Sequence, residues 1–135
     1  MAIVHRRITI LTLSSRPKDD LNERLQWFGN AIGLFNQRDK DKSCFRIFIQ
    51  LLNVAKRNAG LTSDELAFSL RLSRGTVIHH INKLMEAGIV ITEDGKYFLR
   101  VNNLEALVDE IEADMQKALS DLRATAKAID TRLEL

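Results

Sequence analysis

The sequence predicts a mainly α-helical domain of the α+β class with one β-hairpin. Three observations support this prediction. Apolar residues recur at helical spacing in five segments, two β-rich runs flank an Asp-Gly pair, and only two residues separate the third helical segment from the fourth. Because 45% of the 135 residues are hydrophobic, the chain can bury a core of its own.

The N-terminal region is expected to form a strand and then a helix. Residues 3–13 are rich in β-branched side chains and partly alternate, which predicts a strand. Pro17 suits a first helical turn, and the acidic pair Asp19–Asp20 suits a helix N-terminus. The helix expected over about 19–36 carries an apolar seam at alternating steps of four and three, made of Leu21, Leu25, Phe28, Ile32 and Phe35.

Residues 43–58 are apolar nearly all round, which predicts the central core helix, with Gly60 as its end. Cys44 at its start is expected to be an inert core residue. Thr62 and Glu65 have the spacing of a capping box, so a short helix should follow to about Leu70.

After the dipeptide Arg71–Leu72, Ser73 can cap a further helix that runs to Ala87 and stops at Gly88. The next segment, "IVITEDGKYFLRV", reads as a hairpin around Asp94–Gly95. The last 33 residues contain no Gly or Pro and predict one helix over 103–133, roughly 45 Å long.

Helix, tight turn, helix and hairpin is the order of a winged helix-turn-helix. In the segment 73–87, Val77, Ile81 and Leu84 should face inward, and the polar side chains should face a DNA major groove. Gly75 would let the backbone approach a phosphate at the helix N-terminus. The residues expected to contact DNA are Ser73, Arg74, Gly75, Thr76, His79, His80 and Lys83 on the recognition helix, with Lys96 and Arg100 on the wing at 89–101.

The stretch "TVIHHINKLMEAGIV" resembles the recognition helix and wing entry of ArsR-like winged-helix transcription regulators. Thr76, Val77, His79, His80 and Ile81 fit the family pattern, as do Leu84, Ala87, Gly88 and Val90. The resemblance covers roughly residues 43–102 and implies a dimer that presents two recognition helices to successive major grooves. Ile78 departs from it, because the family commonly has Ser there.

The resemblance and the long last helix together predict a homodimer held by a coiled-coil-like interface. The chain would divide into an N-terminal extension (1–18), the winged helix-turn-helix (19–102) and a C-terminal dimerisation helix (103–135). The residues expected at the dimer interface are Leu21, Leu25, Phe28, Ile32, Leu104, Val108, Ile111, Met115, Leu119, Leu122 and Ile129.

Charge is unevenly distributed. Residues 1–55 carry nine Lys/Arg against five Asp/Glu, residues 56–102 carry seven against five, and residues 103–135 carry four against eight. The formal net charge of +2 therefore combines a basic body with an acidic tail, and a basic body suits a nucleic-acid partner.

Several classes of function are disfavoured. The sequence lacks a Gly-rich phosphate loop, a zinc-ligand spacing and a nucleophile elbow, so no enzyme, cofactor or metal is expected. Adjacent helical residues point about 100° apart, so His79 and His80 are poorly placed to chelate one ion. A single Cys, with no signal-peptide pattern and no membrane-length apolar run, favours the cytoplasm.

These observations predict a homodimeric, sequence-specific regulator of transcription that binds double-stranded DNA. Two other interpretations stay open. The winged helix could serve as a protein–protein interaction module or adaptor subunit, or the protein could be a repressor that responds to a small-molecule effector bound between dimer helices.

Overall fold

The computed structural model describes residues 6–35 and 39–135. Its elements are α1 (Leu21–Ala31), α2 (Ser43–Ala55), α3 (Ser63–Leu70), α4 (Arg74–Glu86), β1 (Val90–Glu93), β2 (Lys96–Leu99) and α5 (Leu104–Leu133). The chain divides into two compact units, residues 1–102 and 103–135. None of the helices in the described ranges combines the length and apolar character needed to cross a bilayer.

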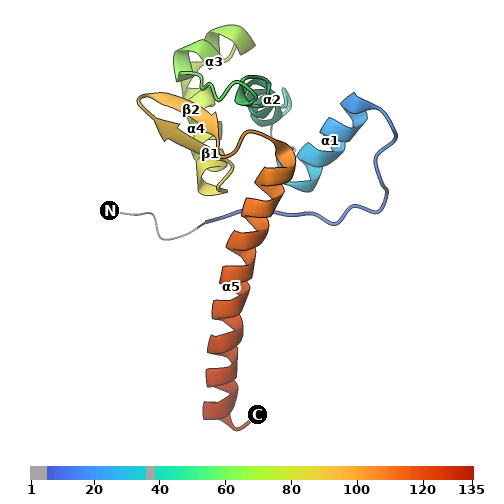
Figure 1. Ribbon diagram of the computed structural model, residues 1–135, viewed down its shortest axis with the longest axis vertical. Helices are drawn as coiled ribbons and strands as arrows, with labels where there is room; N and C mark the ends of the chain where they lie inside the picture. Colours follow the sequence, from blue (N-terminus) through green and yellow to red (C-terminus); the bar gives the residue numbers. More distant parts are fainter. Residues whose placement is uncertain (1–5, 36–38) are drawn as a thin grey trace. The chain divides into compact units, whose positions relative to one another are not determined.

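The first unit is a winged helix-turn-helix, as the sequence predicts. Figure 1 shows α3 and α4 beside α2, with the two-stranded hairpin following α4. The core side chains come mainly from α2 and α4, and Leu66 of α3 and Ile89 complete it. The fully buried residues of this core are Ile47, Phe48, Leu51, Leu66, Val77, Ile81, Leu84 and Ile89.

Capping residues and positive-φ residues fix the ends of α3 and α4, as predicted. The Thr62 side chain accepts a hydrogen bond from the backbone N–H of Glu65, and the Glu65 carboxylate accepts one from the Thr62 N–H. Arg71 then takes a left-handed conformation (φ 57°), which turns the chain within two residues. Gly88 ends α4 with φ 79°, and the Ile89 N–H bonds the Leu84 carbonyl.

The hairpin also forms as predicted. Its strands are antiparallel, with Val90 opposite Leu99 and Glu93 opposite Lys96. Asp94 and Gly95 have φ values of 51° and 77°, the positive angles that a two-residue turn requires.

The first helix is shorter than the predicted range 19–36. It begins after Asp20, whose carboxylate accepts a hydrogen bond from the Glu23 N–H, and its last residue is Ala31. Gly33 is the reason for the early end: at φ 75° it supports a bond from the Leu34 N–H to the Gly29 carbonyl. Residue 36, the last of the predicted helix, lies outside the described residues.

The predicted N-terminal strand is wrong over residues 6–13, which pair with no strand in the part of the chain that the structure describes. Residues 3–5 of the prediction lie outside the described residues. The segment makes single backbone hydrogen bonds instead. The Arg7 N–H donates to the Glu86 carbonyl and the Leu11 N–H donates to the Ala31 carbonyl. The segment is therefore held by the C-terminal ends of α4 and α1.

Gly60 does not end α2, contrary to the sequence prediction. The helix stops at Ala55, and Asn58 supplies the left-handed residue (φ 55°) that follows it. Gly60 is needed instead where the chain passes the wing, because Leu61 and Tyr97 exchange backbone hydrogen bonds of 3.0 and 2.8 Å. A Cβ at Gly60 would lie 2.7 Å from the Tyr97 carbonyl oxygen and from a ring carbon of Phe98.

We expect Gly60→Ala to lower the free energy of unfolding by about 1–3 kcal/mol, because the added methyl group overlaps a backbone carbonyl. Gly75→Ala is the matched control: a Cβ there meets nothing within 4 Å, and Ala favours a helix more than Gly does. Urea unfolding of both variants measures the difference. Equal effects would contradict the proposed close approach.

Candidate nucleic-acid interface

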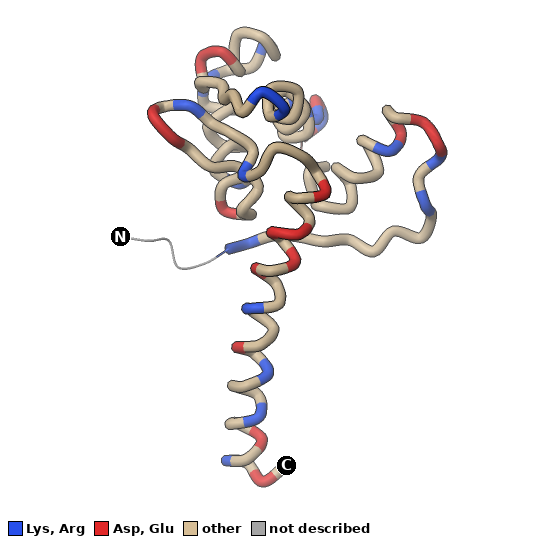
Figure 2. The backbone as a smooth tube through the Cα atoms, in the orientation of Figure 1, with Lys and Arg blue, Asp and Glu red and all other residues tan. Residues whose placement is uncertain are grey.

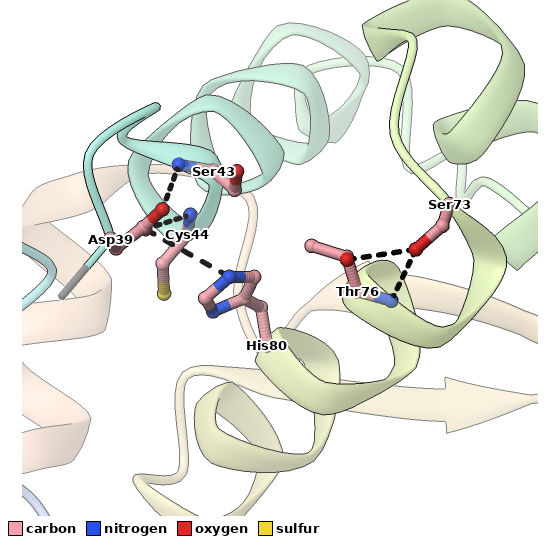
Figure 3. A network of polar contacts seen from close by, with 6 residues as sticks. All are labelled: Asp39, Ser43, Cys44, Ser73, Thr76 and His80. Atoms are coloured by element: carbon pink, nitrogen blue, oxygen red, sulfur yellow. Dashed lines mark hydrogen bonds and ion pairs between the residues drawn. The ribbon is translucent and has the colours of Figure 1, made fainter.

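The start of α4 is fixed by Ser73 (Figure 3). Its hydroxyl oxygen accepts a hydrogen bond of 3.1 Å from the Thr76 N–H, and the same hydroxyl donates to Thr76 Oγ1 at 2.8 Å. Both hydroxyl groups are therefore already engaged with each other. The other N–H groups of the first helical turn have no acceptor within the helix, so they suit an anion.

The inner side of α4 consists of Val77, Ile81 and Leu84, which are buried as predicted, together with His80. His80 is only 8% exposed, so its place in the predicted DNA-contacting set is wrong. The physical reason is helical geometry, because residue 80 lies about 60° from residue 77 and about 40° from residue 84 in projection, on the buried side. This spacing can be read from the sequence, so it could have placed His80 on the buried side.

The outer face of α4 carries Gly75, His79, Asn82 and Lys83, all exposed. Steps of four and three from residue 75 through 79 to 82 place the first three of these residues in one row. The sequence prediction omitted Asn82, although this spacing could have found it. An Asn side chain on such a row can donate to and accept from one adenine edge.

Arg74 lies at the edge of this face. Its Nε is 3.7 Å from an Asp64 carboxylate oxygen on α3, and both side chains are mostly exposed. A solvated pair of this kind holds the guanidinium weakly. Arg74 can therefore exchange Asp64 for another acceptor without leaving a buried charge behind.

A groove runs along α4 beside the loop that precedes α2. Its walls include the N-cap residue Ser73 and, from α4, Thr76, His79 and Lys83. The loop contributes Lys40 together with two acidic residues, Asp39 and Asp41. The acidic residues reduce the positive potential on this side of the helix, so the basic body predicted from the sequence is not uniformly basic at the site.

The two cations predicted on the wing differ in exposure. Lys96 is exposed next to the turn, where acidic and basic positions lie together at the hairpin tip (Figure 2). Arg100 is only partly exposed, and its Nη1 donates to the Gly88 carbonyl at 3.4 Å. The Arg100 side chain therefore links the wing to the turn that follows α4, and its contact with DNA stays a prediction.

His80, Asp39 and Cys44 meet at the N-terminus of α2 (Figure 3). The two Asp39 carboxylate oxygens accept hydrogen bonds of 3.0 Å from the Ser43 and Cys44 N–H groups, and one of them lies 3.8 Å from His80 Nε2. Burial tends to raise the pKa of Asp39, but the two backbone N–H donors outweigh it and leave that pKa lowered. Asp39 thus stays ionised while it caps α2.

Burial also shifts the pKa values of Cys44 and His80, the two neighbours of Asp39. The pKa of Cys44 is raised to about 11, first by burial and then by the Asp39 charge, so its thiol is neutral. Burial lowers the pKa of His80, and the Asp39 charge opposes that shift only in part. No cluster of three metal-ligating side chains exists among the residues that the structure describes.

The residues predicted at the dimer interface fall into two groups. Within the first unit, Leu21 is 74% exposed and Leu25 and Ile32 are half-buried. Phe28 stacks on Phe48 of α2 with ring centroids 6.3 Å apart, so part of the predicted seam contacts the chain's own core. An apolar seam in the sequence cannot by itself show whether the helix packs against the chain's own core or against a second copy of the chain.

Within the second unit, α5 keeps an apolar stripe on its surface. Leu104 at its first turn is half-buried, and Ile111 is buried. The exposed large apolar residues of the helix are Val108, Met115, Leu119, Leu122, Ile129 and Leu133. Both signs of charge occupy the rest of α5 (Figure 2), which is the pattern of a helix with one apolar side.

The family described as winged helix-turn-helix DNA-binding has a model that matches residues 49–91. The match runs from within α2 to the second residue of β1 and includes all of α3 and α4. Residues 49–91 of the chain are therefore similar to winged helix-turn-helix DNA-binding domains. The ArsR-like character of the chain stays a prediction. No curated protein and no solved structure gives a significant match to the chain.

The lowered pKa of His80 makes the fold sensitive to acid. In the unfolded chain His80 protonates near its ordinary pKa of 6.5, and in the folded protein only at lower pH. Its contribution to stability is therefore complete above pH 6.5 and is lost as the pH falls toward the folded-state pKa.

We expect His80→Phe to flatten the fall in unfolding free energy between about pH 7 and pH 5, as measured by urea unfolding at several pH values. His79→Phe, at the exposed neighbouring position, should keep the wild-type slope. A wild-type slope in His80→Phe would show that other groups cause the acid sensitivity.

Proposed function

We propose that the protein is a transcription regulator that binds specific sites in double-stranded DNA as a homodimer. In this proposal α4 enters the major groove and the β1–β2 hairpin contacts the backbone or minor groove. The observation that carries the proposal is the two-sided character of α4: one side is buried in the core and the other is polar and exposed. The family match over residues 49–91 supports the same conclusion.

Base reading is assigned to Arg74, His79 and Asn82. Arg74 has the fork of donors that bridges guanine O6 and N7, and its present partner Asp64 is solvated and replaceable. Asn82 suits adenine, and His79 can donate to a base or phosphate. These three replace the larger set predicted from the sequence.

Phosphate contacts are assigned to the start of α4 and to two lysines. A Cβ placed on Gly75 would meet nothing within 4 Å, so a phosphate can approach the backbone N–H groups that follow Ser73. Lys83 on α4 and Lys96 on the wing are both exposed. Thr76 is half-buried and bonded to Ser73, so it acts with Ser73 in shaping this helix end.

The dimer is proposed to form through the apolar stripe of α5. A helix of 30 residues is about 45 Å long, and its stripe continues beyond Met115 through four further large apolar side chains. A second copy of the same helix offers the complementary stripe. Two recognition helices separated by about 34 Å could then read a pseudo-palindromic site.

Selection of bound sites from a random duplex pool tests the whole proposal. We expect an enriched site made of two related half-sites, spaced by about one helical turn. If the protein does not retard even random duplex DNA at low salt, it is not a DNA-binding regulator, and the interaction-module interpretation replaces this one.

Arg74→Ala and Lys96→Ala should separate base reading from charge. Arg74→Ala should reduce affinity for the selected site about tenfold or more and reduce affinity for random DNA much less, because a bidentate guanine contact is lost. Lys96→Ala should weaken binding to both DNAs alike. It should also reduce the slope of log K against log salt by about one for each Lys96–phosphate contact that is lost.

Fluorescence anisotropy at several salt concentrations measures both effects. If the dimer neutralises about six phosphates, the wild-type slope of log K against log salt is about −5. Equal losses on both DNAs for Arg74→Ala would make that residue a phosphate contact. An unchanged slope for Lys96→Ala would remove the wing from the contacts.

Leu122→Asp should dissociate the dimer, because it places a charge in the middle of the apolar stripe of α5. Ala124→Asp is the control, since residue 124 lies about 200° further round the helix and is exposed. Sedimentation equilibrium measures both. A Leu122→Asp protein that keeps the wild-type mass would exclude α5 as the dimer interface.

A further inference from the structure

Residues 6–13 form an extended segment, and only one of its two edges is bonded to the rest of the first unit. The segment contains no helix, turn or bend, and Figure 1 shows it leading toward α1. In an extended chain the N–H and C=O groups of one residue point to one side, and those of the next residue point to the other side. The odd-numbered and even-numbered residues therefore form two separate edges.

The odd-numbered edge faces the first unit. The Arg7 N–H bonds the last carbonyl of α4, and the Leu11 N–H bonds the last carbonyl of α1. Between them, the Thr9 carbonyl oxygen lies 3.4 Å from the position that a Cβ on Gly33 would take. Three successive odd-numbered residues thus point the same way, and together they fix the orientation of the segment.

The even-numbered edge is open. Ile8, Ile10 and Thr12 make no backbone hydrogen bond to any residue in the ranges 6–35 and 39–135. Ile10 is 48% exposed, and its neighbour Leu11 is 42% exposed. An exposed strand edge that carries apolar and β-branched side chains is a template for a further strand.

The segment is complementary to itself in the antiparallel direction. When Ile10 lies opposite Ile10 of a second copy, Ile8 lies opposite Thr12, and Arg7 lies opposite Leu13. No two charges of the same sign then face each other, and β-branched residues meet across the strands. An in-register parallel pair would instead place the two arginines of each copy side by side. The sequence of the segment therefore favours the antiparallel pair.

This register also uses the whole open edge. With Ile10 opposite Ile10, the even-numbered residues are the hydrogen-bonded ones, so the pair would form about six N–H···O bonds. Two strands of this length bury much less than the roughly 1,200 Å² of a stable interface. The strand pair would therefore join a dimer that is held mainly elsewhere, which here is the proposed α5 dimer.

We propose that residues 8–12 of two copies of the chain pair as antiparallel strands centred on Ile10, through the edge that faces away from the first unit. The inference rests on the homodimer of the proposed function and adds a second contact to it. The β-rich segment then obtains from a second copy the strand partner that the described part of its own chain does not supply.

Cysteine cross-linking of the full chain tests the register. Ile10→Cys should form a disulfide between two copies under mild oxidation, because Cα atoms of a hydrogen-bonded antiparallel pair lie about 5.5 Å apart. Thr12→Cys, also at an exposed position, is the matched control, since the two residues 12 would be four strand positions apart, roughly 14 Å. The native Cys44 is buried. Equal cross-linking of both variants, or none in Ile10→Cys, would overturn the strand pair.

Proline substitution gives a second measurement. Ile10→Pro removes both N–H groups of the central residue pair and should weaken dimerisation about tenfold. Thr9→Pro removes an N–H from the other edge, where it makes no backbone hydrogen bond to a described residue, so the dimer dissociation constant should change much less. Sedimentation equilibrium measures both constants. Equal weakening by the two prolines would contradict pairing through the even-numbered edge.

Combining Ile10→Cys with Leu122→Asp separates this proposal from the proposed function. Cross-linking should fall severalfold in the double variant, because the α5 dimer brings the strands together. A dimeric protein that gives no Ile10→Cys cross-link contradicts the strand pair alone. Cross-linking that persists undiminished in the double variant supports the strand pair and contradicts the α5 dimer. A monomeric protein without cross-links contradicts both.

Discussion

The packing of Val77, Ile81 and Leu84 against the core fixes the rotation of α4 about its own axis, and the rest of the interface depends on that rotation. Each of these side chains contributes on the order of 1.5–3 kcal/mol by its burial. Turning the helix by one residue would expose part of this set and bury polar groups in its place. The outer row of Gly75, His79 and Asn82 is therefore held in one direction by contacts on the opposite side of the helix.

Asp39 connects this helix to the rest of the unit. Its carboxylate caps α2 through two backbone N–H groups and lies beside His80 on the inner side of α4. One side chain thus caps the core helix and places a negative charge beside a buried ring on α4. Both residues of this pair line a cavity beside α4.

In the proposed DNA complex, the acidic side chains around α4 would lower the non-specific affinity for DNA. Asp39, Asp41 and Asp64 lie near the exposed side chains of α4, and the wing turn carries Glu93 and Asp94 beside Lys96. Few cations remain for phosphate contacts, and such contacts supply most non-specific affinity. In the proposed dimer, two copies would together compensate for weak DNA binding by each one. Once the first copy is bound, the second is held close to its own half-site.

The sequence by itself determined the order of the elements, because capping residues, helical periodicity and the Asp94–Gly95 turn are local signals. It correctly predicted the Thr62–Glu65 capping box, the Ser73 cap, the stop at Gly88 and the extent of α5. Only the tertiary structure decided where the ambiguous side chains go. His80, Gly60 and residues 6–13 were misassigned. Gly60 and residues 6–13 are placed by contacts with residues distant in the chain, which no local pattern records, whereas the buried side of His80 follows from its spacing to Val77 and Leu84.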